Sequence, residues 1–159
     1  MTPLTQTNNA GRAFGIASTV VAQMGILLGM VSSQQPQIAL IIASSASAIS
    51  GSFGDAFSMF VSESTAKREA YVSATSVFNT KITVGLVYIA IYMFFKNPLH
   101  SVFLATLVSL SLIYFISLQI VEADPSKSVT TVFGNYVGLT TTVVLITSMV
   151  GFFIRSIRN

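Results

Sequence analysis

Residues Ile41–Tyr71 read IIASSASAISGSFGDAFSMFVSESTAKREAY, and this stretch decides both the fold class and the candidate site. It begins as an uncharged helix of the kind that crosses a membrane, and then places Asp55, Met59 and Glu63 at intervals of four residues. A charged side chain at the centre of a membrane helix costs about 2.5–3.5 kcal/mol on insertion scales. Asp55 is the only carboxylate that lies inside an apolar segment, so a functional interpretation has to account for it.

The composition of the whole chain is that of a membrane protein. Of its 159 residues, 52% are hydrophobic and 8% are charged, whereas soluble domains carry about 25% charged residues. The eight Lys and Arg residues are scattered at the ends of the apolar segments, which is typical of topology and headgroup charges and not of a nucleic-acid surface. The chain has no cysteine and no Walker, GxSxG or HExxH motif. These observations predict a protein that is not an enzyme and does not bind nucleic acid.

Five apolar runs predict an all-α membrane protein with five transmembrane helices in a single domain, residues 1–159. A helix needs about 20 apolar residues to cross the bilayer. The first run could instead be a signal peptide, but it is longer than a signal core and only Arg12 precedes it as a basic residue. The third run is short, so residues 67–81 are expected to form a helix-and-loop connection that supplies its first turn. The predicted helices cover about residues 13–31, 38–62, 77–95, 99–121 and 129–154.

The basic residues favour a cytoplasmic N-terminus for this integral, multi-pass protein. With that orientation, five Lys and Arg residues lie in the inner segments and three in the outer ones, in keeping with the positive-inside rule. All the acidic residues then lie in the inner half of the protein, where an incoming cation would meet them first. The compartment stays open between a vacuole-like organelle and the plasma membrane. The acidic residues are Asp55, Glu63, Glu69, Glu122 and Asp124.

The spacing of Asp55, Met59 and Glu63 places the three side chains on one face of a helix. Carboxylate oxygen suits hard divalent ions, and thioether sulfur suits softer transition metals. Together they predict a weak, reversible metal site, which is what a transporter needs because the ion has to leave again. The alternative is structural: Asp55 would be a buried carboxylate bonded to Ser or Asn, and Met59 would contribute packing only.

The remaining polar residues of the apolar segments are weaker candidates. We expect His100 to be an interfacial residue and not a ligand, and Lys81 not to lie deep in a helix, which makes a retinal Schiff base improbable. Gln23, Gln119 and Asn135 could line a pathway or form hydrogen bonds across helices, and the bonding role is favoured.

The run AISGSFGDAFSMFVSE, Ala48–Glu63, resembles the second helix of the vacuolar iron transporter family, which includes nodulin-like members and short prokaryotic relatives. The family has a run of small residues, then a Ser-Met pair and a Glu four residues later, which match Ser58, Met59 and Glu63 here. Some short relatives carry an Asp at the position of Asp55. The five-helix layout also agrees. The similarity in helix layout covers most of the chain, and the matching motif covers about 16 residues.

The resemblance implies a homodimer that exports Fe²⁺ from the cytosol in exchange for protons, with the metal path at the subunit interface. Two features depart from the family: Phe14 stands where the family has an Asp on the first helix, and the cytoplasmic metal-binding helices between the second and third spans are missing. Asp55 would then take over the role of the missing acid.

We therefore predict a transporter for divalent transition-metal cations of the Fe²⁺/Mn²⁺ class that works by proton antiport. Its intramembrane metal ligands would be Asp55, Met59 and Glu63, with proton exchange at Asp55 and no cofactor besides the transported ion. Its partners would be the lipid bilayer, a second copy of the chain, metal ions and protons. Two alternatives remain: a transport-inactive scaffold or regulator with the same fold, and a passive ion pore.

Overall fold

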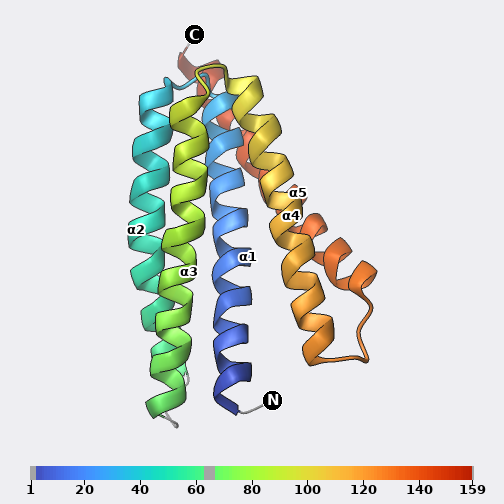
Figure 1. Ribbon diagram of the computed structural model, residues 1–159. Helices are drawn as coiled ribbons and strands as arrows, with labels where there is room; N and C mark the ends of the chain where they lie inside the picture. The colour runs from blue at the N-terminus through green and yellow to red at the C-terminus, as the bar shows by residue number, and fades with distance from the viewer. Residues whose placement is uncertain (1–2, 63–66, 159) are drawn as a thin grey trace.

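The computed structural model describes residues 3–62 and 67–158. Within these residues the regular secondary structure is all α-helix, and short turns join the helices (Figure 1). Each of the helices is long and apolar enough to cross a membrane. They run alternately in opposite directions, so the N-terminus and the α4–α5 turn lie at one end of the bundle and the C-terminus at the other. The helices are α1 (Pro3–Ser32), α2 (Gln37–Ser62), α3 (Lys67–Phe94), α4 (Pro98–Ala123) and α5 (Val129–Arg158).

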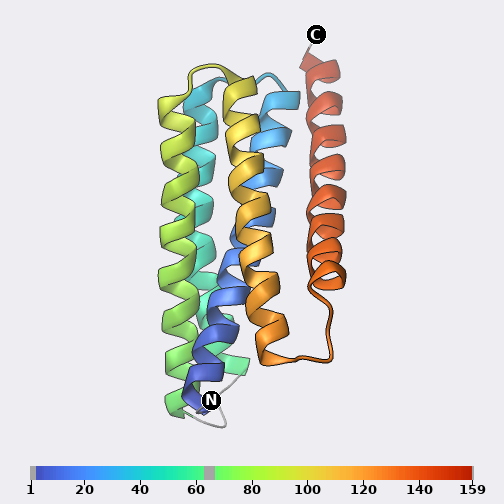
Figure 2. The same cartoon turned by 45° about the vertical axis from the view of Figure 1, so that its right-hand side comes forward.

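Helix α1 is the centre of the bundle and contacts each of the other helices. Its buried side chains Val20 and Leu27 belong to one apolar cluster with Tyr88 and Tyr92 of α3 and Ile116 of α4. Helix α5 packs against α1 and α4 on the outside, as Figure 2 shows. Large apolar side chains such as Phe94 and Leu99 point outward, which suits a lipid environment. The prediction of an all-α fold with five helices, each long and apolar enough to cross a membrane, is therefore confirmed for the described residues.

The ends of the helices carry local signals that stop one helix and start the next. Asn97 caps α4 by accepting a hydrogen bond from the backbone N–H of Leu99 at 2.9 Å, and Pro98 occupies the first turn. After α4, the Oδ1 atom of Asp124 accepts a 2.6 Å hydrogen bond from the Ser126 hydroxyl. This bond, with a smaller contribution from Lys127, holds the pKa of the Asp124 carboxyl below its ordinary value.

Glycine residues allow two close approaches between helices. A Cβ atom at Gly151 of α5 would lie 2.5 Å from the carbonyl oxygen of Gly29 on α1, so no larger residue fits. A Cβ atom at Gly85 of α3 would lie 2.7 Å from the Cβ atom of Ala48 on α2. Small residues bring membrane helices together because dispersion contacts replace the hydrophobic effect there.

The main difference from the sequence-based expectation concerns α3, which begins at Lys67 and not near residue 77. The polar residues that resemble a loop pack against α1: Ser73 is fully buried, and the Ser76 hydroxyl donates to the carbonyl oxygen of Asn8 at 3.0 Å. Gly11 provides the space, because a Cβ atom there would lie 2.8 Å from the carbonyl oxygen of Ser73. The extra turns place Lys81 in the middle of α3.

The contact between Gly29 and Gly151 gives a direct test of the α1–α5 packing. We expect Gly151→Ala to lower the thermal midpoint of the protein in detergent, because overpacking a tight contact costs about 1–3 kcal/mol. The matched control is Gly138→Ala on the same helix, where a Cβ atom meets no atom of the described residues within 4 Å. Equal midpoints for the two variants would contradict this arrangement of α5.

Candidate functional site

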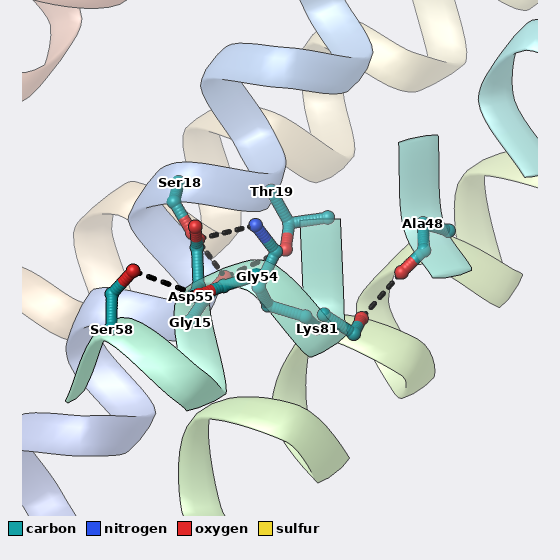
Figure 3. A network of polar contacts seen from close by, with 9 residues as sticks. Gly15, Ser18, Thr19, Ala48, Gly54, Asp55, Ser58 and Lys81 are labelled. Atoms are coloured by element: carbon teal, nitrogen blue, oxygen red, sulfur yellow. Dashed lines mark hydrogen bonds and ion pairs between the residues drawn. The ribbon is translucent and has the colours of Figure 1, made fainter. Parts of the chain in front are cut away.

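The structure pairs Asp55 of α2 with Lys81 of α3 inside the bundle (Figure 3). The ammonium group of Lys81 donates to the Oδ2 atom of Asp55 at 2.5 Å, and the two side chains are 7% and 30% exposed. Both residues lie within segments that can cross a membrane. The expectation that Lys81 does not lie deep in a helix is wrong, because α3 extends fourteen residues before it and thirteen after it.

Small residues on α2 make room for this pair. A Cβ atom at Gly51, one turn before Asp55, would lie 3.2 Å from the Lys81 nitrogen, so a larger residue would displace the ammonium group. The neighbouring hydroxyl groups are occupied by their own helix: Ser52 donates to the carbonyl oxygen of Ala48, and Ser58 to that of Gly54. The Asp55 carboxylate is therefore paired with the ammonium group of Lys81, whereas the structural alternative expected a hydrogen bond from Ser or Asn.

The pair makes two membrane-embedded charges tolerable. A single buried charge costs several kcal/mol, and attraction to an opposite charge at close range offsets much of that cost. Asp55 lies seven residues before the end of α2, which is about 10 Å at the helical rise of 1.5 Å per residue. The ion pair is thus below the headgroup region, between the middle of α2 and the N-terminal end of the bundle.

The structure describes two of the three predicted metal ligands. Asp55 and Met59 are both partly buried on α2, and Glu63 lies outside the described residues. Within residues 3–62 and 67–158, no group of three or more Asp, Glu or His side chains is close enough to hold a metal ion. The predicted set of metal ligands therefore includes Asp55, whose carboxylate already has a cationic partner, Lys81.

Two other residues singled out from the sequence are Phe14 and His100. Phe14 is 45% exposed and lines an open groove between α1 and α5. His100 is exposed in the first turn of α4, at the C-terminal end of the bundle, with its ring centroid 6.5 Å from that of Phe95. This position agrees with an interfacial residue.

Beyond the ion pair, toward the C-terminal end of the bundle, the interface of α1, α2 and α3 stays polar. The amide nitrogen of Gln23 donates to the carbonyl oxygen of Ser44 at 3.2 Å, and the Tyr92 hydroxyl donates to the carbonyl oxygen of Gln23 at 3.3 Å. The bonding role predicted for Gln23 is confirmed. The side-chain oxygens of Gln23 and Ser44 are buried without a partner in the described part of the chain.

Lys81 is the residue of this candidate site that the sequence interpretation missed. The signal was present, because Ala70, Ser73, Val77, Lys81 and Val84 recur at the spacing of one helix face, and all are buried. If this helical spacing had been followed through residues 67–81, Lys81 would have been placed inside a helix that packs against the first two helices.

These features define an all-α protein whose described residues form five candidate membrane-spanning helices, with an ion pair between two of them. Comparison of the chain with protein-family models, with curated proteins and with solved structures finds no significant match. The resemblance to the vacuolar iron transporter family therefore stays a prediction based on the motif of α2.

A double-mutant cycle measures the energetic role of the pair. We expect Asp55→Asn and Lys81→Met each to reduce stability by about 3–5 kcal/mol, because either change leaves a buried charge without its partner. The double variant should recover most of the loss, measured as unfolding in mixed micelles. The control Asp124→Asn removes the exposed contact with Lys127, at 3.3 Å, and should change little. Single variants as stable as this control would contradict the buried ion pair.

Proposed function

We propose that the protein is a transporter for divalent transition-metal cations of the Fe²⁺/Mn²⁺ class, in which Asp55 binds the ion. The observation that carries the proposal is the 2.5 Å contact between the Asp55 carboxylate and a cationic group within a membrane span. Ionisable residues inside membrane segments are rare and commonly mark ion pathways. In this proposal the Lys81 ammonium occupies the carboxylate when no metal is bound.

Charge balance couples metal binding to proton release. The carboxylate and the ammonium together carry no net charge, whereas a divalent ion added to this pair would leave two excess positive charges in the membrane. Loss of one proton from Lys81 lowers that excess to a single charge and removes the repulsion between the ammonium and the metal. Antiport of metal and proton follows, with Lys81 as the proton-carrying group in place of Asp55.

Further ligands would come from the same face of α2 and from a second subunit. Met59 lies one turn from Asp55 toward the N-terminal end of the bundle, and Glu63 follows it in the sequence. The proposed homodimer agrees with the open groove of about 990 Å³ between α1 and α5, whose lining is largely apolar and rich in small residues. Such a surface suits close contact with another membrane helix.

A second candidate function is a membrane scaffold or regulator without transport activity. The observation in its favour is the same ion pair, because an Asp55 that is already neutralised has no need of a metal. The lack of a three-ligand cluster among the described residues also favours it. The two candidates differ in what Lys81 has to do: release a proton, or keep it permanently.

Replacement of Lys81 by Arg separates these roles. Arginine keeps the positive charge and can pair with Asp55, but it does not lose its proton in proteins. In proteoliposomes loaded with a pH-sensitive dye, we expect Mn²⁺ uptake and proton counterflow in the wild type. Lys81→Arg and Asp55→Asn should lose at least about 90% of this uptake, a tenfold effect that corresponds to about 1.4 kcal/mol. Met59→Ala should be partly reduced.

The control is Asp124→Asn, which alters an exposed acid in the α4–α5 turn and should transport normally. Equal uptake in the wild type and in all the variants would refute a role for the pair in transport. A wild-type protein that shows neither Mn²⁺-dependent proton flux nor a Mn²⁺-dependent thermal shift would favour the scaffold.

A further inference from the structure

A cavity separate from the ion pair lies between α1, α3 and α4, with a volume of about 440 Å³. It opens in the half of the bundle that carries the N-terminus, where α4 leans away from α3 (Figure 1). Its polar lining includes Arg12, Asn79 and Gln119. Its apolar lining consists of Ile16, Val84 and Phe115.

On α1 and α4 the lining of the cavity changes from polar to apolar along the direction of the helices. Arg12 lies four residues inside the candidate span of α1, and Gln119 lies four residues before the end of α4, so each is about 6 Å from the end of its span. Ile16 and Phe115 lie one turn deeper on the same two helices. On these two helices the lining is therefore polar at the depth of lipid headgroups and apolar one turn deeper, whereas α3 contributes Thr83 beside Val84 at the deeper level.

Two polar groups of this cavity have no partner in the described part of the chain. The side-chain oxygen of Gln119 is buried and accepts no hydrogen bond. The guanidinium of Arg12 is exposed and forms no ion pair with a described carboxylate. By contrast, the hydroxyl of Ser76 donates to the backbone carbonyl oxygen of Asn8. The hydroxyl of Thr83 donates to the backbone carbonyl oxygen of Asn79. A buried acceptor without a hydrogen-bond donor destabilises the protein by about 1–3 kcal/mol, so binding of a ligand that supplies a donor is favoured.

We propose that this cavity binds one phospholipid whose head group carries a hydrogen-bond donor. The phosphodiester lies on Arg12, because guanidinium and phosphate form charge-assisted hydrogen bonds, and basic pockets between membrane helices suit phospholipid head groups. A hydroxyl or ammonium group of the head group donates to Gln119. The first part of an acyl chain covers Ile16, Val84 and Phe115. Free phosphate shares the contact with Arg12 but leaves the apolar half of the cavity empty.

Native mass spectrometry of the delipidated protein tests this proposal without reference to transport. The probes are phosphatidylglycerol and phosphatidylethanolamine, which carry donors, phosphatidylcholine, which carries none, and inorganic phosphate. We expect the first two lipids to bind roughly tenfold more tightly than phosphatidylcholine, the effect of one buried hydrogen bond. Inorganic phosphate should not displace them. Equal affinities for phosphatidylglycerol and phosphatidylcholine would overturn the proposal. Full displacement of the bound lipid by inorganic phosphate would overturn it as well.

Two variants assign the binding to the cavity. Arg12→Gln should bind every phospholipid more weakly, whereas Arg68→Gln, which changes an exposed cation of α3 at the same end of the bundle, should bind as the wild type does. Gln119→Leu should keep phosphatidylcholine binding and lose the preference for lipids with a donor, so it tests the site even if Arg12→Gln does not fold. Wild-type lipid preference in Gln119→Leu, or equal loss in Arg12→Gln and Arg68→Gln, would overturn the assignment.

Discussion

The ion pair between Asp55 and Lys81 is the constraint on which the bundle depends. Either charge alone would be costly at this depth, so the two helices that carry them have to lie side by side in a register that lets the groups meet. Gly51 leaves room for the ammonium group, and a few residues farther on Gly85 lets α3 close against Ala48. Helix α1 packs against both of these helices. A charge interaction thus sets the register, and small residues bring the helices into contact.

Much of the fold follows from the sequence because a membrane leaves few alternatives. Backbone groups in hydrocarbon have to be paired internally, so long apolar runs become helices. The bounds of two helices were predicted within two residues: α2 covers Gln37–Ser62 and α4 covers Pro98–Ala123. Both begin at clear signals, Pro36 before α2 and the Asn97-Pro98 cap of α4.

The start of α3 and the partner of Asp55 were not predictable in the same way. Hydropathy describes composition only. It does not show that Gly11 of α1 leaves space beside Ser73, or that the carbonyl oxygen of Asn8 accepts a hydrogen bond from Ser76. Lys81 becomes an intramembrane residue only when those turns are helical, and its partner is defined only by the register of α2 and α3. The sequence therefore identified Asp55, Met59 and Glu63 as the candidate site, but it gave no sign that the Asp55 carboxylate has a cationic partner. In the structure that carboxylate is paired with the Lys81 ammonium group, so in the proposed transporter a metal has to compete with this cation.

The most direct test is a solid-state NMR measurement of the dipolar coupling between Lys81 Nζ and Asp55 Cγ in lipid bilayers. With Cd²⁺ as a diamagnetic divalent probe, the proposal predicts a strong coupling in the metal-free protein. Saturation with Cd²⁺ should abolish it and shift the Lys81 nitrogen to the position of a neutral amine. A missing coupling without metal would contradict the ion pair itself. A coupling that persists unchanged at saturating Cd²⁺ would contradict the exchange of metal for proton at this site.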